Sequence, residues 1–352
     1  MSVSVVIAAG GTAGHVVPAL AVADTLRDRG VHVEFIGGNR AEATLVPEAG
    51  YPLHQLDVKG FSRTDPTEAA KAGLKAVGAT RKASKLLKEL KPDVVLGGGG
   101  YVAGVAGIAA VRRKIPLVLT EADSHLGMSN KYLAKYAKKL CLAFELDGIE
   151  ADNVVVTGRP VPPPATDRAA ARARFGVPEG EPLILVFGGS LGAKSINDAA
   201  IEGLANRSYH VLHACGTRDY DYLKPLLPKV NYQLEPYIDR FNEALLASDL
   251  VVARSGGSVF EIAAHGKPSI LVPYPSAAGD HQRGNAMALV ERTAAVLIDD
   301  FELTPERLRA RVESLLASPD RLRSMGEAAL AFARPDAAEA IAAEVLAAAS
   351  AS

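Results

Sequence analysis

Short apolar runs alternate with helix-like segments along the whole chain. In the first half, seven runs are typical of buried strands: Val3–Ala9, His32–Ile36, Leu53–Leu56, Val94–Leu96, Leu117–Thr120, Lys139–Ala143 and Val154–Thr157. Helix-like segments separate most of them, which is the pattern of a parallel sheet with right-handed crossovers. A second series follows: Leu183–Phe187, Tyr209–Ala214, Tyr232–Glu235, Leu250–Ala253, Ser269–Pro273 and Ala295–Ile298. The pattern predicts an α/β protein with two Rossmann-like, doubly wound domains.

A proline cluster separates the two series. Four prolines fall between Gly158 and Pro164, and proline at this density continues neither a helix nor a central strand. A length of 352 residues also suits two domains. We therefore expect an N-terminal domain over residues 1–158 and a second domain over 159–336. The alanine-rich helix at 337–352 could pack back to complete the first domain.

Four of the apolar runs end in glycines just before a helix-like segment. The junctions are Gly10–His15, Gly97–Tyr101, Gly188–Ala193 and Arg254–Ser258. Such a junction directs unpaired backbone N–H groups and the positive end of a helix dipole at one place, which suits a phosphate. Two junctions in each half predict two domains that handle phosphate-bearing molecules.

The first junction is not a dinucleotide fingerprint. Its glycines fall at positions 10, 11 and 14, and Glu34 lies inside the second strand and not at its tip, so a nicotinamide enzyme is disfavoured. His15 stands where the first helix begins. There the helix dipole lowers the imidazole pKa, so that a neutral ring could accept a proton near pH 7. A capping or packing histidine remains an equal alternative.

The second half offers candidate ligand contacts after its strands. Ser258 followed by Glu261 fits a capping box, which the residues alone favour slightly over a Glu261 carboxylate that holds a ribose diol. Further on, Asp280 is expected to cap a helix. His281, Gln282 and Asn285 are candidate sugar contacts, because loops at the carboxyl ends of strands form the ligand crevice of open sheets.

Charge is unevenly distributed although the net charge is only −1. Residues 71–139 hold 14 basic and 4 acidic residues, a net +10, and the basic residues alternate with apolar ones over Thr67–Leu90. A solvated helix face is the commonest reason for such a pattern. A membrane-surface patch for anionic lipid is the functional alternative, and it ranks above nucleic acid. No His/Cys cluster has metal-ligand spacing, and Cys141 and Cys215 are typical of buried thiols.

Taken together, these motifs resemble the MurG family of UDP-N-acetylglucosamine–N-acetylmuramyl-(pentapeptide) pyrophosphoryl-undecaprenol N-acetylglucosamine transferases. The resemblance covers essentially the whole chain. It rests on Gly10–Ala19, Gly98–Gly104, Gly188–Ala193, Arg254–Gly257 and Glu261–Pro268. The chain departs from the family with Ala13 for glycine, Leu191 for glutamine and Arg159-Pro160-Val161-Pro162 for Asn-Pro-Val-Arg. It also has Thr120-Glu121-Ala122-Asp123 for His-Glu-Gln-Asn.

The resemblance implies a GT-B architecture, with two Rossmann-like domains facing a deep cleft. The C-terminal domain would bind UDP-N-acetylglucosamine through Ser190, Gly257 and Ser258 at the diphosphate, Ile238 at uracil, Glu261 at the ribose and Gln282 at the sugar. This implication moves the preferred role of Glu261 from cap to ribose. Arg159 is hypothesised to replace the family arginine absent at Pro162. The N-terminal domain would bind the acceptor, lipid I, through Thr12, Gly14, His15, Gly99, Gly100, Tyr101, Glu121 and Asn130.

The implied reaction is an inverting transfer to the C4 hydroxyl of the muramyl sugar. His15 is the expected base, or the group that orients the hydroxyl, and helix N-termini would stabilise the leaving UDP without a metal or cofactor. The enzyme would lie on the cytoplasmic face of the inner membrane, held by anionic phospholipid. Two alternatives stay open: another GT-B enzyme that uses a UDP-sugar, such as a glycolipid transferase or a 2-epimerase, and a non-catalytic UDP-sugar-binding protein.

Overall fold

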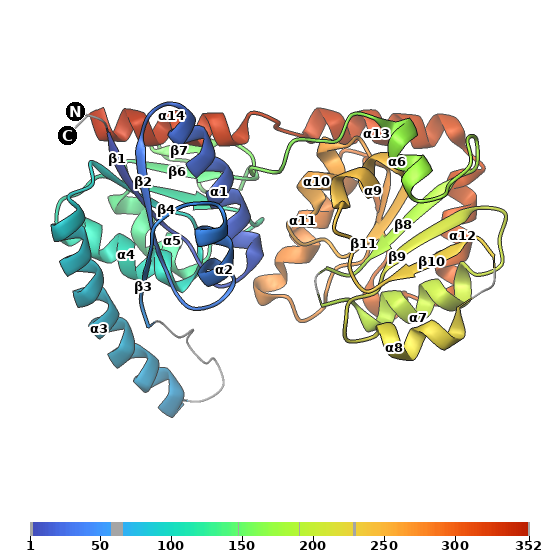
Figure 1. The fold of residues 1–352 in the computed structure, drawn as a ribbon, viewed down its shortest axis with the longest axis horizontal. Coiled ribbons are helices and arrows are strands. Elements are labelled where there is room, and N and C mark those ends of the chain that lie inside the picture. The colour runs from blue at the N-terminus through green and yellow to red at the C-terminus, as the bar shows by residue number, and fades with distance from the viewer. Residues whose placement is uncertain (1–2, 58–65, 147, 190, 228–229, 351–352) are drawn as a thin grey trace. The chain divides into compact units, whose positions relative to one another are not determined.

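The computed structural model describes residues 3–57, 66–146, 148–189, 191–227 and 230–350. It divides into two compact units, each built around one sheet (Figure 1). Unit 1 comprises residues 1–161 and 334–352, and unit 2 comprises residues 162–333. The chain therefore leaves unit 1 near the proline cluster and returns to it for the final helix.

Unit 1 is a seven-stranded parallel sheet in the order β3-β2-β1-β4-β5-β6-β7. Its strands are β1 (Ser4–Ala8), β2 (His32–Gly37), β3 (Leu53–Gln55), β4 (Val94–Gly97), β5 (Leu117–Glu121), β6 (Lys139–Leu142) and β7 (Val154–Val156). Its helices are α1 (Ala13–Asp28), α2 (Ala41–Glu48), α3 (Pro66–Leu90), α4 (Gly100–Arg112), α5 (Met128–Leu133) and α14 (Ala337–Ser350).

The sheet of unit 1 is buried on both faces. Alternate β1 residues point to opposite sides, so that Val5 and Ile7 join the core under α1, α2 and α14, whereas Val6 and Ala8 join the core under α3, α4 and α5. The C-terminal helix α14 contributes Ile341 and other apolar residues to the first of these cores. The last helix is thus an integral part of unit 1.

Unit 2 repeats the design with a six-stranded parallel sheet in the order β10-β9-β8-β11-β12-β13. Its strands are β8 (Leu183–Phe187), β9 (His210–Ala214), β10 (Tyr232–Glu235), β11 (Leu250–Ala253), β12 (Ser269–Leu271) and β13 (Ala295–Leu297). Its α-helices are α6 (Arg168–Arg174), α7 (Lys194–Gly203), α8 (Tyr220–Leu223), α9 (Phe241–Ala247), α10 (Val259–Ala264), α11 (His281–Val290), α12 (Pro305–Leu316) and α13 (Pro319–Phe332).

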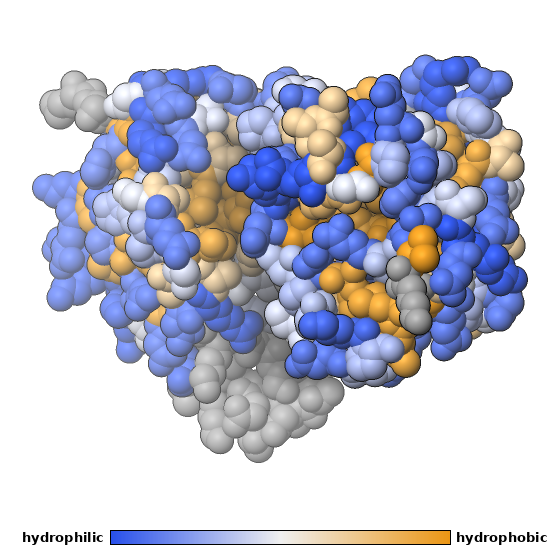
Figure 2. All heavy atoms as spheres, turned by 45° about the vertical axis from the view of Figure 1, so that its right-hand side comes forward, coloured by the Kyte–Doolittle hydropathy of each residue, from blue (hydrophilic) through white to orange (hydrophobic). Residues whose placement is uncertain are grey.

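The prediction of two doubly wound parallel-sheet domains is confirmed. On the face drawn in Figure 2, polar side chains form most of the outermost surface, and apolar side chains lie mainly in recesses between them. No helix in the described part of the chain is long and apolar enough to cross a bilayer.

Strand order explains where ligands can bind. In unit 1 the order reverses between β1 and β4, and in unit 2 it reverses between β8 and β11. At such a reversal the two following loops turn to opposite faces of the sheet and leave a crevice at the carboxyl ends of the strands. The four glycine junctions are the loops that follow these four strands. Each unit therefore has both of its glycine junctions at one crevice.

Candidate functional site

In unit 1 the two glycine loops pack directly against each other. The first loop, taken as residues 9–14, follows β1 and includes the first two residues of α1, and the second loop, taken as residues 98–100, follows β4 and includes the first residue of α4. A Cβ atom on Gly100 would lie 2.2 Å from the Gly10 carbonyl oxygen, and one on Gly99 would lie 2.6 Å from Cδ2 of His15. Gly99 and Gly100 also have φ angles of 105° and 78°, which L side chains rarely adopt. Only glycines allow this approach.

His15 is the third residue of α1, as predicted, and its ring lies against the second loop. The pKa of His15 is lowered from 6.5, chiefly because burial disfavours the charged ring. Arg159 lowers this pKa further, whereas Asp123, Glu42 and the Gly10 carbonyl raise it. Its buried Nδ1 has no partner of good hydrogen-bond geometry among the described residues. Burial therefore favours the neutral ring.

Thr12 and Gly14 form the start of α1 beside His15. Thr12 occupies the N-cap position, and its exposed side chain makes no capping hydrogen bond. The Gly14 carbonyl accepts a hydrogen bond of 2.8 Å from Nη2 of Arg159. Arg159, which the resemblance assigns to the donor, thus has a direct contact with the first loop of unit 1.

Glu121 and Asn130 organise the loop that follows β5. The Glu121 carboxylate accepts hydrogen bonds from the N–H groups of Gly127 at 2.7 Å and Ala122 at 3.1 Å, and from Nδ2 of Asn130 at 3.0 Å. Burial raises the pKa of Glu121, and the bonds from Gly127 and Asn130 oppose this rise. Both predicted acceptor contacts thus use polar atoms to shape their own loop. Tyr101, by contrast, is 51% exposed at the start of α4.

A small pocket brings these residues together. Its lining includes His15, Thr120, Glu121 and Arg159, with apolar atoms of α1 behind them. The volume of about 20 Å³ holds one water molecule and is far too small for a sugar. Of the predicted acceptor residues, Gly14 and Glu121 line this pocket together with His15, and a sugar acceptor must bind outside it.

Glu42 is a member of this site that the sequence pattern did not single out. It is only 1% exposed, and its carboxylate accepts hydrogen bonds from the N–H groups of Gly11 and Gly38, both at 2.8 Å. The first glycine loop was expected to donate its backbone N–H groups to a phosphate. The N–H of Gly11 instead donates to Glu42. The sequence around Glu42 does not predict this contact, because the contact with Gly11 requires β1 to lie beside β2.

In unit 2 the glycine loops after β8 and β11 occupy the equivalent position. A Cβ atom on Gly192, at φ 73°, would lie 1.9 Å from the Cys215 carbonyl oxygen, so this loop also requires glycine. Ser190, predicted to contact the diphosphate, lies outside the described residues. The neighbouring Leu191 is 73% exposed.

Arg254, at the start of the loop after β11, is a buried anchor. It donates to the carbonyls of Val272 at 3.1 Å and Pro273 at 3.0 Å, and it pairs with Asp300 at 2.5 Å. These contacts fix the direction in which Gly257 and Ser258 leave the sheet.

The capping box that the residues slightly favoured is not formed. Ser258 occupies the N-cap position of α10 in the right-handed helical conformation, φ −61° and ψ −13°, and makes no side-chain capping bond. N-cap residues normally have extended backbone. Here Val259 N–H and Phe260 N–H bond instead to the carbonyls of Gly256 and Gly257, which continues the turn before the helix.

The cap predicted at Asp280 is also wrong. Asp280 precedes α11, but its backbone is left-handed with φ 54°, and its side chain makes no capping bond. Nδ1 of His281 instead lies 2.9 Å from the Ala278 carbonyl oxygen.

Ile238 and Gln282 present polar groups suited to a ligand. The backbone N–H and C=O of Ile238 have no hydrogen-bond partner within the described chain. The side-chain oxygen of Gln282 accepts from Tyr274 N–H at 3.0 Å, and its Nε2 has no partner in that same part of the molecule. Gln282 lies beside the loop after β11, since its Nε2 is 3.8 Å from a Cβ built on Gly256.

The expectation that the chain lacks an Asp-x-Asp segment is wrong, because Asp219-Tyr220-Asp221 is such a segment. Asp219 is buried and accepts hydrogen bonds from Nδ2 of Asn197 at 2.8 Å and from Arg218 at 2.7 Å, which together lower its pKa. It is thus engaged in the scaffold. No group of three or more His, Cys, Asp or Glu side chains in the described ranges is arranged to hold a metal.

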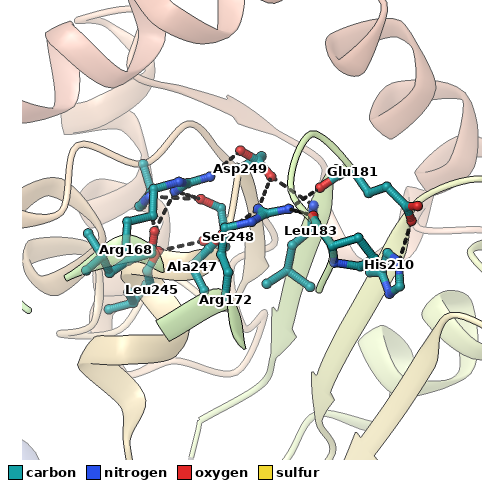
Figure 3. A network of polar contacts seen from close by, with 12 residues as sticks. Arg168, Arg172, Glu181, Leu183, His210, Leu245, Ala247, Ser248 and Asp249 are labelled. Atoms are coloured by element: carbon teal, nitrogen blue, oxygen red, sulfur yellow. Dashed lines mark hydrogen bonds and ion pairs between the residues drawn. The ribbon is translucent and has the colours of Figure 1, made fainter. Parts of the chain in front are cut away.

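A separate polar network lies at the opposite, amino-terminal edge of the unit 2 sheet (Figure 3). Asp249 pairs with Arg168 at 2.6 Å and Arg172 at 3.2 Å, and it accepts from Leu183 N–H at 2.9 Å. Both arginines and Lys267 also donate to carbonyls at the end of α9. This arrangement satisfies a helix C-terminus with cations and has a structural role.

The chain matches known proteins over nearly its full length. Residues 5–142 match the glycosyltransferase family 28 N-terminal domain, and residues 183–341 match the family 28 C-terminal domain. A UDP-N-acetylglucosamine–N-acetylmuramyl-(pentapeptide) pyrophosphoryl-undecaprenol N-acetylglucosamine transferase of Desulforamulus reducens is 38% identical over 354 residues, covering 94% of this chain and 95% of the relative. The relative of the same name from Listeria monocytogenes is 36% identical over 349 residues, covering 95% and 96%.

Solved structures also resemble this chain over nearly its full length. The crystal structure of Acinetobacter baumannii MurG is 30% identical, with a TM-score of 0.81 over 99% of this chain and 100% of that one. The calicheamicin glycosyltransferase CalG4 is 18% identical with a TM-score of 0.73 over 97% and 98%, a likeness of fold alone. This chain belongs to glycosyltransferase family 28.

Proposed function

We propose that this enzyme transfers N-acetylglucosamine from UDP-N-acetylglucosamine to the C4 hydroxyl of the muramyl sugar of undecaprenyl-pyrophosphoryl-MurNAc-pentapeptide, converting lipid I to lipid II for peptidoglycan synthesis. The observation that carries this proposal is identity of 35–38% along almost the whole chain with relatives named for that reaction. The match includes both units, so the chain has a counterpart of the relatives' donor-binding part and of their acceptor-binding part.

Unit 2 is the proposed donor site. The free N–H and C=O of Ile238 can pair with the edge of uracil, whose carbonyl and imide groups need one donor and one acceptor. Ser190, Gly257 and Ser258 would contact the diphosphate, and Glu261 would hold the ribose. The absence of a capping bond at Ser258 supports these assignments, because its hydroxyl is not committed to the helix. Gln282 would direct its Nε2 to a sugar hydroxyl.

Unit 1 is the proposed acceptor site, with His15 as the base or the group that orients the attacking hydroxyl. A neutral imidazole accepts the C4 hydroxyl proton as the oxygen bonds to C1 of N-acetylglucosamine, and UDP leaves from the opposite face with inversion. Backbone N–H groups of the unit 2 loops would stabilise the charge that develops on the diphosphate. Thr12, Gly14, Gly99, Gly100 and Tyr101 would surround the acceptor sugar. Glu121 and Asn130 would act by shaping their loop.

Membrane attachment is proposed for the basic part of unit 1. Met128, Tyr132 and Tyr136 are exposed by 82%, 57% and 47%, although they are apolar or aromatic. Lys135 lies over both tyrosine rings, and Lys131 is exposed beside them. Aromatic side chains among lysines suit the headgroup region of an anionic bilayer, here the cytoplasmic face of the inner membrane.

The test is transfer of labelled N-acetylglucosamine to a lipid I analogue by the parent enzyme and by His15→Ala. We expect transfer to fall by about 10²-fold or more in His15→Ala, in the range of a lost general base, with UDP binding by calorimetry unchanged. His32→Ala, at an exposed histidine of the same unit, is the control. Turnover of UDP-N-acetylglucosamine without acceptor would indicate an epimerase, and donor binding without any turnover would indicate a non-catalytic protein. Flotation with vesicles with and without anionic lipid tests the membrane proposal.

A further inference from the structure

Glu42 is a buried carboxylate with no ion-pair partner among the described residues, and it lies between the loops that follow β1 and β2. Gly11 and Gly38 donate to it from the loops after β1 and β2. A Cβ atom on Gly10 or Gly38 would lie 2.7 Å from its Oε1, and one on Gly37 would lie 2.8 Å from its Cγ. Three glycines therefore enclose one side chain.

Burying a carboxylate is costly, and two hydrogen bonds offset the cost only in part. Glu42 belongs to α2, so its carboxylate joins α2 to the loop that starts α1 and to the end of β2. The loop that it closes carries His15 four residues after Gly11. Without this carboxylate, the buried N–H of Gly38 would lose its partner and the first loop would lose its link to α2.

We propose that Glu42 is a positioning residue for the transfer reaction: its carboxylate closes the first glycine loop and holds His15 against Gly99. This inference rests on the proposed role of His15. It also means that the N–H of Gly11 is not available to a phosphate of the acceptor.

The charge of Glu42 allows the proposal to be tested through the pKa of His15 as well as through stability. The groups that act on the His15 pKa come from every element around it: Glu42 on α2, Asp123 after β5, Arg159 after β7 and the Gly10 carbonyl. Glu42 raises this pKa. Removing its charge should therefore lower the His15 pKa, whereas a change that merely loosened packing would expose the ring to water and raise it.

The experiment compares Glu42→Gln with Glu48→Gln, the same change at an exposed residue of the same helix. We expect Glu42→Gln to lower kcat by about 10-fold or more, because small misplacements of a reacting group cost this much, with the donor KM unchanged. The His15 Cε1–H resonance, assigned with His15→Ala, should titrate at lower pH than in the parent. Glu42→Asp keeps the charge but cannot span both N–H groups, so its kcat should fall while its His15 titration stays closer to that of the parent.

Two results would overturn the inference: a Glu42→Gln enzyme with the kcat and titration of the Glu48→Gln control, or a lower kcat with an unchanged or raised His15 titration. If Glu42→Gln does not fold, Glu42→Asp carries the test through its kcat, and a kcat equal to that of the parent refutes the inference. Failure of the proposed function is distinguishable, because the parent itself would then transfer no sugar while the NMR titration would still decide whether Glu42 acts on His15.

Discussion

The substitution Gly99→Ala tests whether the position of His15 controls the chemistry. An added Cβ would lie 2.6 Å from Cδ2 of the ring, whereas ordinary van der Waals contact begins at 3.4 Å, so the ring or the loop must shift by about 0.8 Å. Displacements near 1 Å at a reacting group cost up to about 10²-fold in rate. We therefore expect kcat to fall by about 10- to 100-fold, with donor affinity unchanged because the proposed uracil and sugar contacts belong to unit 2.

Gly99→Ala also places a side chain at a φ of 105°, so backbone strain needs a control. Gly50→Ala supplies it: Gly50 has a φ of 81° in the same unit, and nothing lies within 4 Å of its Cβ position. Each variant should lose about 1–2 kcal/mol of stability, a fall in melting temperature of about 2–8 °C for a unit of this size. Steady-state transfer rates and thermal melts decide the matter. If Gly99→Ala transferred sugar as fast as Gly50→Ala, the contact with His15 would have no part in catalysis.

Two further predictions follow from the pKa and contact data. Because burial lowers the pKa of His15 below 6.5, its neutral form persists at lower pH, and the acid decline of kcat/KM for transfer should have its midpoint below pH 6.5; a midpoint above pH 6.5 would contradict a His15 base. Asp249→Asn leaves Arg168 and Arg172 without their shared carboxylate, and for this partly buried cluster we expect a loss of about 2–4 kcal/mol in the unfolding free energy, measured with urea. Asp198→Asn, which removes an exposed pair with Lys194, should cost less than about 1 kcal/mol, and an equal loss in both variants would refute the structural role of the cluster.

The sequence predicts the strands well because parallel strands covered on both faces are continuous apolar runs. Each of the thirteen strands in the described part of the chain lies within one residue of, or inside, its predicted run. The order of the strands in the sheet, by contrast, does not follow from these apolar runs. Nothing in the run Val94–Leu96 states that β4 pairs with β1, and this pairing is what brings Gly99 to His15. The return of α14 to unit 1 was likewise only one option, since an alanine-rich helix can pack on many surfaces.

In the candidate site, too, some features follow from local sequence and others depend on the folded structure. His15 and the glycine loops were predictable, because helix starts and glycine junctions leave local signals. The two predicted caps failed because capping depends on backbone conformation, which is right-handed helical at Ser258 and left-handed at Asp280. Arg254 fitted the donor motif, but only the structure reveals that Asp300 and two carbonyls occupy its guanidinium.

The two units use one backbone design for opposite electrostatic purposes. In unit 1 the glycine loop encloses Glu42, a negative charge without an ion-pair partner in the described chain, so a second anion at Gly11 would meet repulsion and find its donor occupied. In unit 2 the loop after β11 is anchored by Arg254, whose charge Asp300 balances. Under the proposed function, the same strand–glycine–helix junction serves a hydroxyl beside a neutral histidine in one unit and a leaving diphosphate in the other. This division of charge fits a transferase whose donor is a nucleoside diphosphate sugar and whose acceptor presents an alcohol.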